Sequence, residues 1–231
     1  MKTLGEIAGG GTCREVMADA GSVLLPGDLV LPDGAVGLVV FAHGSGSSRF
    51  SRRNHLVADV LHHAGLGTLL FDLLTPEEER ADEVTRQFRF DVPMLARRLV
   101  AVVRWLRDVP EAAGLPIGLF GASTGGGAAL MAAAELGPVV GAVVSRGGRP
   151  DLAGAALAEV RAPTLLIVGG YDDVVIDLNE DALARLRCEK RLRIVPGATH
   201  LFEEPGKLEQ VARLTSEWFL RHLPEQTSAD I

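Results

Sequence analysis

The 231-residue sequence has little cysteine, no long apolar run and no excess of positive charge. Its two cysteines, Cys13 and Cys188, lack metal-type spacing and are too few for a disulfide framework, so we expect a reducing, cytoplasmic environment. No apolar run reaches the roughly 20 residues that cross a bilayer. The first residues, MKTLGEIAGGGT, contain no apolar segment of the kind found in signal peptides. We therefore expect neither membrane association nor secretion.

The net charge of −7 argues against nucleic acid as a partner, because binding phosphates requires a basic surface. Hydrophobic residues make up 47% of the chain, which is enough for a sizeable core in one domain. No Pro- or Ser-rich linker divides the sequence. We expect a single domain over residues 1–231, with residues 1–20 as a loose N-terminal arm, present as a monomer or a small homo-oligomer.

Short apolar runs alternate with helical patterns along the chain, which predicts a mostly parallel α/β sheet with helices on both faces. An antiparallel strand or hairpin in SVLLPGDLVLP comes first. The expected parallel strands follow as VGLVVFAHG, LGTLLFDLL, PIGLFGAS, VVGAVVSRG, APTLLIVGG and KRLRIVPG. Apolar residues at helical spacing predict one helix over 92–108 and a last helix over 207–223. The polar segment TPEEERADEVTRQF is expected to be a loop that becomes helical.

A single serine, Ser123, follows the apolar strand in IGLFGASTGGGAALMAA, where the sequence reads G-x-S-x-G. A sharp strand-to-helix turn lifts the serine oxygen clear of the sheet, and glycines at 121 and 125 remove the resulting clashes. An exposed hydroxyl near a base can attack an acyl carbon, so we predict that Ser123 is a nucleophile. The rival interpretation is a phosphate-binding loop. It is disfavoured because no lysine follows the glycines and this turn contains no G-x-G-x-x-G.

A base and an acid should follow the nucleophile in the order acid, then histidine. Of the two histidines that follow Ser123, His222 lies late in the last helix and fits an exposed helix end. His200 comes directly after the last expected strand, in RIVPGATH. That position is the carboxyl edge of the sheet, where open α/β folds place their ligands. We therefore predict that His200 is the base.

Three aspartates follow the preceding strand in LLIVGGYDDVVID, and Asp172 is the expected partner of His200. Asp173 remains an alternative acid. Asp177 is better explained as the N-cap of a helix that starts near Leu178.

Two backbone N–H groups are expected to stabilise an oxyanion. One belongs to Thr124, directly after the nucleophile, and the other to Ser45, in the loop FAHGSGSS after the first long strand. His43 precedes Ser123 and breaks the required order for a base, so we interpret it as a structural residue that supports this loop.

Arginines cluster after two of the expected strands, at Arg49, Arg52 and Arg53 and again at Arg146 and Arg149. One interpretation is that they are solvated and paired with neighbouring carboxylates. The other is that Arg49, Arg146 and Arg149 form a rim that binds an anionic group of the substrate, because guanidinium groups match carboxylate and phosphate. The sequence leaves both interpretations open.

The stretches HGSGSS, GASTGG, VGGYDDVV and GATHLFEEPG together resemble the α/β-hydrolases, close to the small lidless members of the dienelactone hydrolase-like group. The resemblance extends from about Gly21 to Leu223. It implies a triad of Ser123, Asp172 and His200 that needs neither metal nor cofactor. Dienelactone hydrolases proper carry a cysteine nucleophile, so serine here favours hydrolysis of small carboxylic esters in general. The segment between the strands VVGAVVSRG and APTLLIVGG is too short for a large cap.

Two further functions stay open at this point. The same triad could pass the acyl group to an acceptor other than water, as an acyltransferase or perhydrolase does. Alternatively, the chain could be a catalytically silent domain that uses this fold for binding.

Overall fold

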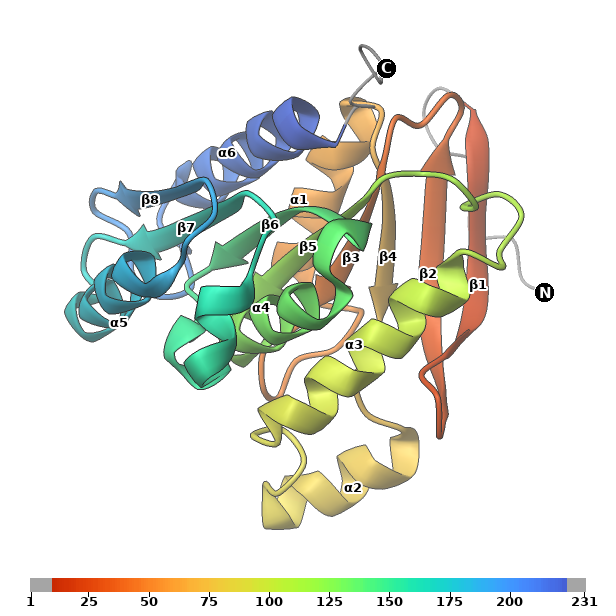
Figure 1. The fold of residues 1–231 in the computed structure, drawn as a ribbon, viewed down its shortest axis with the longest axis horizontal. Helices are drawn as coiled ribbons and strands as arrows, with labels where there is room; N and C mark the ends of the chain where they lie inside the picture. Colours follow the sequence, from red (N-terminus) through yellow and green to blue (C-terminus); the bar gives the residue numbers. More distant parts are fainter. Residues whose placement is uncertain (1–9, 224–231) are drawn as a thin grey trace.

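The computed structural model describes residues 10–223 and folds them around one eight-stranded sheet (Figure 1). The strand order is β1-β2-β4-β3-β5-β6-β7-β8. The first two strands are antiparallel to their neighbours, and all the others pair in parallel. The strands are β1 (Gly11–Asp19), β2 (Leu24–Pro32), β3 (Leu38–Ala42), β4 (Gly67–Phe71), β5 (Ile117–Ala122), β6 (Val140–Arg146), β7 (Thr164–Gly169) and β8 (Lys190–Val195). The predicted mostly parallel sheet is thereby confirmed.

Helices cover both faces of the sheet, so the protein has three layers and two apolar cores (Figure 1). One core packs the sheet against α3, α4 and α5, and the other packs its opposite face against α1 and α6. The helices are α1 (Arg52–His63), α2 (Pro76–Thr85), α3 (Val92–Leu106), α4 (Thr124–Leu136), α5 (Asp173–Arg185) and α6 (Lys207–His222), with short 3₁₀ segments η1 (Gly137–Val139) and η2 (Pro150–Glu159). Parallel strands buried on both faces explain the continuous apolar runs of the sequence.

Local signals in the sequence define α3 well. The Asp91 side chain accepts a hydrogen bond from the N–H of Met94 at 2.9 Å and caps the helix. The apolar residues that follow at helical spacing are all buried against the sheet: Leu95, Leu99, Val102, Val103 and Leu106. The predicted helix over 92–108 is confirmed to within two residues of its end.

The polar segment after β4 is helical from its start. Thr75 and Glu78 form a capping box, and Pro76 occupies the first turn of α2. Glu78 also forms two hydrogen bonds to the buried Arg98 of α3, at 2.6 and 2.7 Å. These contacts hold α2 beside α3, outside the main layers of the fold (Figure 1).

The prediction of a loose N-terminal arm over residues 1–20 is wrong for residues 11–19. Gly11–Asp19 forms β1 and pairs with β2 along its full length. Val16 and Ala18 alternate with exposed residues and enter the core, which a free arm would not do. Residues 1–9 lie outside the described part of the chain.

Candidate active site

Ser123 lies in a strained turn between β5 and α4, with φ 51° and ψ −123°. A side chain rarely adopts a positive φ, and such strain persists only where neighbouring structure enforces it. Here the backbone is tightly packed. A Cβ at Gly121 would lie 2.4 Å from the carbonyl oxygen of Gly125, and a Cβ at Gly125 would lie 2.1 Å from that of Ala42. The two glycines of the motif are therefore required by close backbone contacts, as the sequence predicts.

Three hydrogen bonds hold this turn. The N–H of Ser123 donates to the carbonyl of Arg146 at the end of β6, at 3.2 Å. The carbonyl of Ser123 accepts from the N–H groups of Gly126 and Arg149, at 2.9 and 3.0 Å. The backbone is thus fully engaged, and the hydroxyl is left at the edge of the sheet.

Asp172 and His200 form a hydrogen-bonded pair, with 2.6 Å between Oδ2 and Nδ1. The loop that carries His200 is bonded to the turn after β7, since the N–H of Tyr171 donates to the carbonyl of Ala198 at 2.9 Å. A carboxylate only accepts, so Nδ1 of His200 donates this hydrogen bond. The structure brings Asp172 to the histidine and leaves Asp173, the alternative acid, in the first turn of α5.

The role expected for Asp177 is wrong. Helix α5 begins at Asp173, with Asp172 in the N-cap position, and Asp177 lies inside the helix. The run VVID has strand-like composition, but β7 ends at Gly169 and the turn that follows leads directly into the helix. Asp172 therefore lies at the N-terminus of α5 and also contacts His200.

One pocket of about 260 Å³ brings the predicted nucleophile and base together. Ser123 and His200 both line it, although they are far apart in the sequence. The backbone of Gly147 lies against the imidazole, since a Cβ there would be 3.4 Å from Cε1 of His200. The remaining lining residues are Gly44, Ser45, Ser47, Ser51, Arg53, Asn54, Ala122, Arg146 and Leu201.

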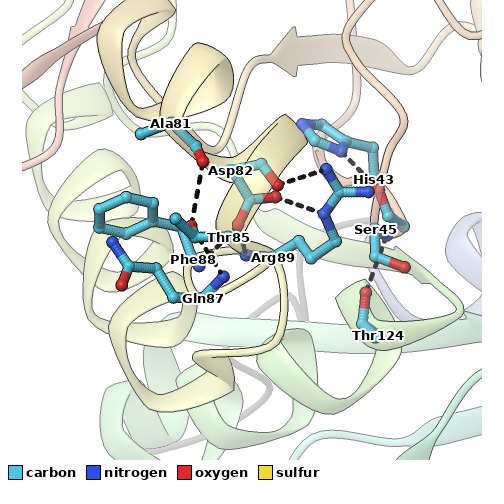
Figure 2. A network of polar contacts seen from close by, with 10 residues as sticks. His43, Ser45, Ala81, Asp82, Thr85, Gln87, Phe88, Arg89 and Thr124 are labelled. Atoms are coloured by element: carbon cyan, nitrogen blue, oxygen red, sulfur yellow. Dashed lines mark hydrogen bonds and ion pairs between the residues drawn. The ribbon is translucent and has the colours of Figure 1, made fainter.

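The loop after β3 contacts the start of α4 through the two residues expected to supply oxyanion donors. The N–H of Ser45 donates to Oγ1 of Thr124 at 2.9 Å (Figure 2). The Ser45 N–H therefore already has a hydrogen-bond acceptor within the protein. The N–H of Thr124 lies in the first turn of α4, where a helix has no internal acceptor for it.

His43 holds the loop after β3 through two hydrogen bonds of its imidazole ring. Its Nε2 accepts a hydrogen bond from the N–H of Leu73 at 3.0 Å, so Nδ1 carries the proton and donates to the carbonyl of Gly44 at 2.9 Å. The side chain is buried, and burial lowers its pKa below the usual histidine value. The geometry matches the structural role predicted for His43.

Sequence reasoning missed an ion pair that packs on the same loop. Arg89 pairs with Asp82 of α2 (Figure 2). The Asp82 side chain is buried, with an exposed fraction of only 1%. Burial by itself would raise the pKa of Asp82. The hydrogen bonds from Arg89 and from the N–H of Phe88 lower the pKa by a larger amount, so the net shift is downward. A Cβ at Gly46 would be 3.3 Å from Nη1 of Arg89, so the guanidinium lies against the loop. The sequence predicts only a loop that becomes helical in this segment, and no local pattern links Asp82 to Arg89.

Two of the three arginines expected at an anion-binding rim already have carboxylate partners. Arg49 lies 3.4 Å from Asp28 and 3.7 Å from Asp72, and also reaches Glu15. Arg149 forms two hydrogen bonds to Asp151, at 2.8 and 2.7 Å. For these two residues the structure supports the alternative of carboxylate pairing.

Arg146 is different, because it is 7% exposed and lines the pocket of Ser123. Among residues 10–223, no group accepts a hydrogen bond from its buried Nε and Nη1. Burial, with a smaller contribution from Arg53, lowers its pKa to about 10, so it is still cationic at neutral pH. Arg53 lines the same pocket from α1 and was not singled out as a site residue.

Two other kinds of feature are absent from the described residues. Within 10–223, no cluster of three or more His, Cys, Asp or Glu side chains could hold a metal ion. Over the same range, no helix has both the length and the apolar character needed to cross a membrane.

A family model described as "Dienelactone hydrolase family" matches residues 25–221. The crystal structure of a dienelactone hydrolase from Anabaena variabilis is 60% identical, with a TM-score of 0.91 over 92% of this chain and 99% of that chain. Est1E from Butyrivibrio proteoclasticus is 16% identical over 91% of this chain and 98% of its own, with a TM-score of 0.72, and shares the fold alone.

A curated relative is considerably longer than this chain. A protein of Mycobacterium tuberculosis (strain H37Rv), whose name proposes a phosphoribosyl transferase, is 60% identical over 210 residues. The match covers 91% of this chain and 46% of that protein. The chain thus spans about half the length of this relative.

Proposed function

The chain belongs to the dienelactone hydrolase family, and on that premise we propose that it hydrolyses small carboxylic esters through an acyl-enzyme on Ser123. It has the α/β-hydrolase fold without a large cap within residues 10–223, as the sequence predicts. One observation carries the proposal. Nδ1 of His200 lies 2.6 Å from Oδ2 of Asp172, and His200 lines the same pocket as Ser123.

In the proposed reaction, His200 Nε2 accepts the hydroxyl proton while Oγ of Ser123 attacks the ester carbonyl carbon. The tetrahedral intermediate collapses, its bond to the alcohol breaks, and the alcohol leaves with the proton from His200. Water then attacks the acyl-enzyme and gives its proton to His200. Cleavage of the Ser123 ester releases the acid and returns the proton to Oγ. Asp172 orients the imidazole and stabilises its cation.

The oxyanion is proposed to bind at the N-terminus of α4. The Thr124 N–H lacks an internal acceptor, and the helix dipole favours negative charge there. Ser45 remains the proposed second donor. The Ser45 N–H donates to Oγ1 of Thr124, so it can bind the oxyanion only if the Thr124 hydroxyl moves away.

Hydrolysis is favoured over acyl transfer or perhydrolysis because water can reach the proposed base, since the side chain of His200 is 39% exposed. The transferase in the name of the mycobacterial relative is a property proposed for a chain about twice as long. We do not extend it to this chain, whose pocket geometry supports acyl chemistry.

A fluorophosphonate probe and a neutral activated ester test the proposal. Wild type should be labelled and should turn over the ester. Ser123→Ala should lose labelling and at least about three orders of magnitude of turnover. Ser22→Ala, an exposed serine in the turn between β1 and β2, is the matched control and should behave as wild type. A folded wild type that is neither labelled nor active would instead indicate a binding domain.

A further inference from the structure

The buried guanidinium of Arg146 is an exception within this protein. Other poorly exposed arginines have carboxylate partners: Arg98 meets Glu78 at 2.6 Å, and Arg49 lies between Asp28 and Asp72. No carboxylate within the described residues lies within 4.0 Å of Arg146. A buried charge without a partner is costly, so a protein that retains one in a pocket is expected to bind an anion there.

A second guanidinium increases this charge. Arg53 lines the same pocket, and its buried Nε has no hydrogen-bond acceptor among residues 10–223. Its Nη1 lies 3.0 Å from Glu203, whose side chain is 63% exposed. Glu203 neutralises Arg53 at the rim only, where solvent screens the pair. The two arginines repel each other, and an anion between them would remove that repulsion.

The pocket also offers neutral hydrogen-bonding groups. Ser47 and Ser51 line it beside Arg53, and each hydroxyl can donate to an oxyanion. A carboxylate would neutralise only one guanidinium, whereas a phosphate monoester carries close to two negative charges at neutral pH. Three phosphate oxygens can engage both guanidiniums and one hydroxyl together.

We propose that Arg146 and Arg53 form a subsite for a phosphate group carried by the substrate itself, so that the protein cleaves phosphorylated carboxylic esters. The inference rests on the proposed function, because the subsite lies in the pocket that contains Ser123. This subsite differs from the anion-binding rim predicted from the sequence, because Arg49 and Arg149 are paired with carboxylates.

The test uses three acetate esters whose alcohol parts end in a neutral, a carboxylate or a phosphate group. The alcohols are 1-propanol, 3-hydroxypropanoic acid and the monophosphate of 1,3-propanediol, and acetate release is followed at pH 8. Wild type should prefer the phosphate ester to the neutral one by at least about tenfold in kcat/KM, through charge-assisted hydrogen bonds. The carboxylate ester should fall between the two.

Arg146→Met retains the length and volume of the side chain but removes its charge. It should abolish most of the preference, measured as the ratio of kcat/KM for the phosphate ester to kcat/KM for the propyl ester. Arg53→Met should reduce the preference partly, and Arg146→Lys should restore part of it. Arg149→Met is the matched control, because that guanidinium is paired with Asp151, and it should keep the full preference. Thermal unfolding confirms that each variant is folded.

Each outcome discriminates. Turnover of all three esters without preference, or a preference unchanged in Arg146→Met, would mean that water alone solvates the guanidinium and would overturn the subsite. A stronger preference for the carboxylate ester would overturn the assignment to phosphate. If no ester is cleaved and no fluorophosphonate labelling occurs, the proposed hydrolase function fails. Calorimetric titration of Ser123→Ala with 3-hydroxypropyl phosphate then tests the subsite alone, and absence of Arg146-dependent binding rejects it.

Discussion

The backbone carbonyl of Arg146 accepts a hydrogen bond from the N–H of Ser123 at 3.2 Å. The end of β6 therefore holds the turn that carries the hydroxyl, while the side chain of the same residue enters the pocket beside it. The backbone contact does not depend on the side chain. Replacing the Arg146 guanidinium should thus alter recognition without releasing the turn.

The two adjacent aspartates should differ sharply in their effect on catalysis. Asp172→Asn removes the carboxylate that fixes the tautomer of His200, and should lower kcat for a neutral ester by about 10³- to 10⁴-fold. Asp173→Asn is the matched control. It changes only a first-turn charge of α5 and should keep nearly full activity. Steady-state kinetics measure both variants. A larger loss of kcat in Asp173→Asn would mean that Asp173, and not Asp172, is the acid.

Gly147 should be required for the position of His200. Its φ is +50°, and a Cβ would lie 3.2 Å from the carbonyl oxygen and 3.4 Å from Cε1 of His200. Gly147→Ala should cost about 1–3 kcal/mol of unfolding free energy through backbone strain. By displacing the imidazole it should also lower kcat by about tenfold to a hundredfold.

Gly154→Ala separates these two effects. Gly154 has a similar φ, +53°, but a Cβ added there would have no atom within 4 Å. It should lose comparable stability, measured by denaturant unfolding, and retain kcat. Equal kcat values for the two variants would show that contact with Gly147 does not position His200.

The Asp82–Arg89 pair should stabilise the fold in a pH-dependent way. Asp82 is buried, so Asp82→Asn should lower the unfolding free energy by about 3–5 kcal/mol at pH 7, because it leaves Arg89 without its partner. The folded pKa of Asp82 is lowered, so its contribution is complete above the unfolded value of about 3.9 and is lost as pH falls through the folded value.

The difference between wild type and Asp82→Asn should therefore be largest near neutral pH and shrink below about pH 4. Arg80→Met is the control, because Arg80 pairs with Glu77 on the exposed face of α2 and should cost less than about 1 kcal/mol at any pH. Urea unfolding across this range measures both. A difference that grows as pH falls would contradict the sign of the Asp82 shift.

Several features were predictable because they depend on neighbouring residues in the chain. The turn at Ser123 requires glycine two positions away on either side, and the helix over 92–108 has its cap and apolar stripe in one segment. The start of α5 was mispredicted because VVID suits a strand equally well, and only the end of β7 at Gly169 decides between them. Strand β1 was missed because its partner, β2, is what makes it a strand.

The sequence by itself determined the succession of parallel strands along the chain, the serine turn and the histidine after the last strand. These follow from local backbone geometry and hydrophobic periodicity. Only the tertiary structure decided which aspartate meets His200, 28 residues away, and that the Ser45 N–H engages Thr124, 79 residues away. It also decided that Arg49 and Arg149 meet carboxylates while Arg146 meets none within the described chain. Such pairings depend on the packing of distant segments, about which the spacing of residues along the chain contains no information.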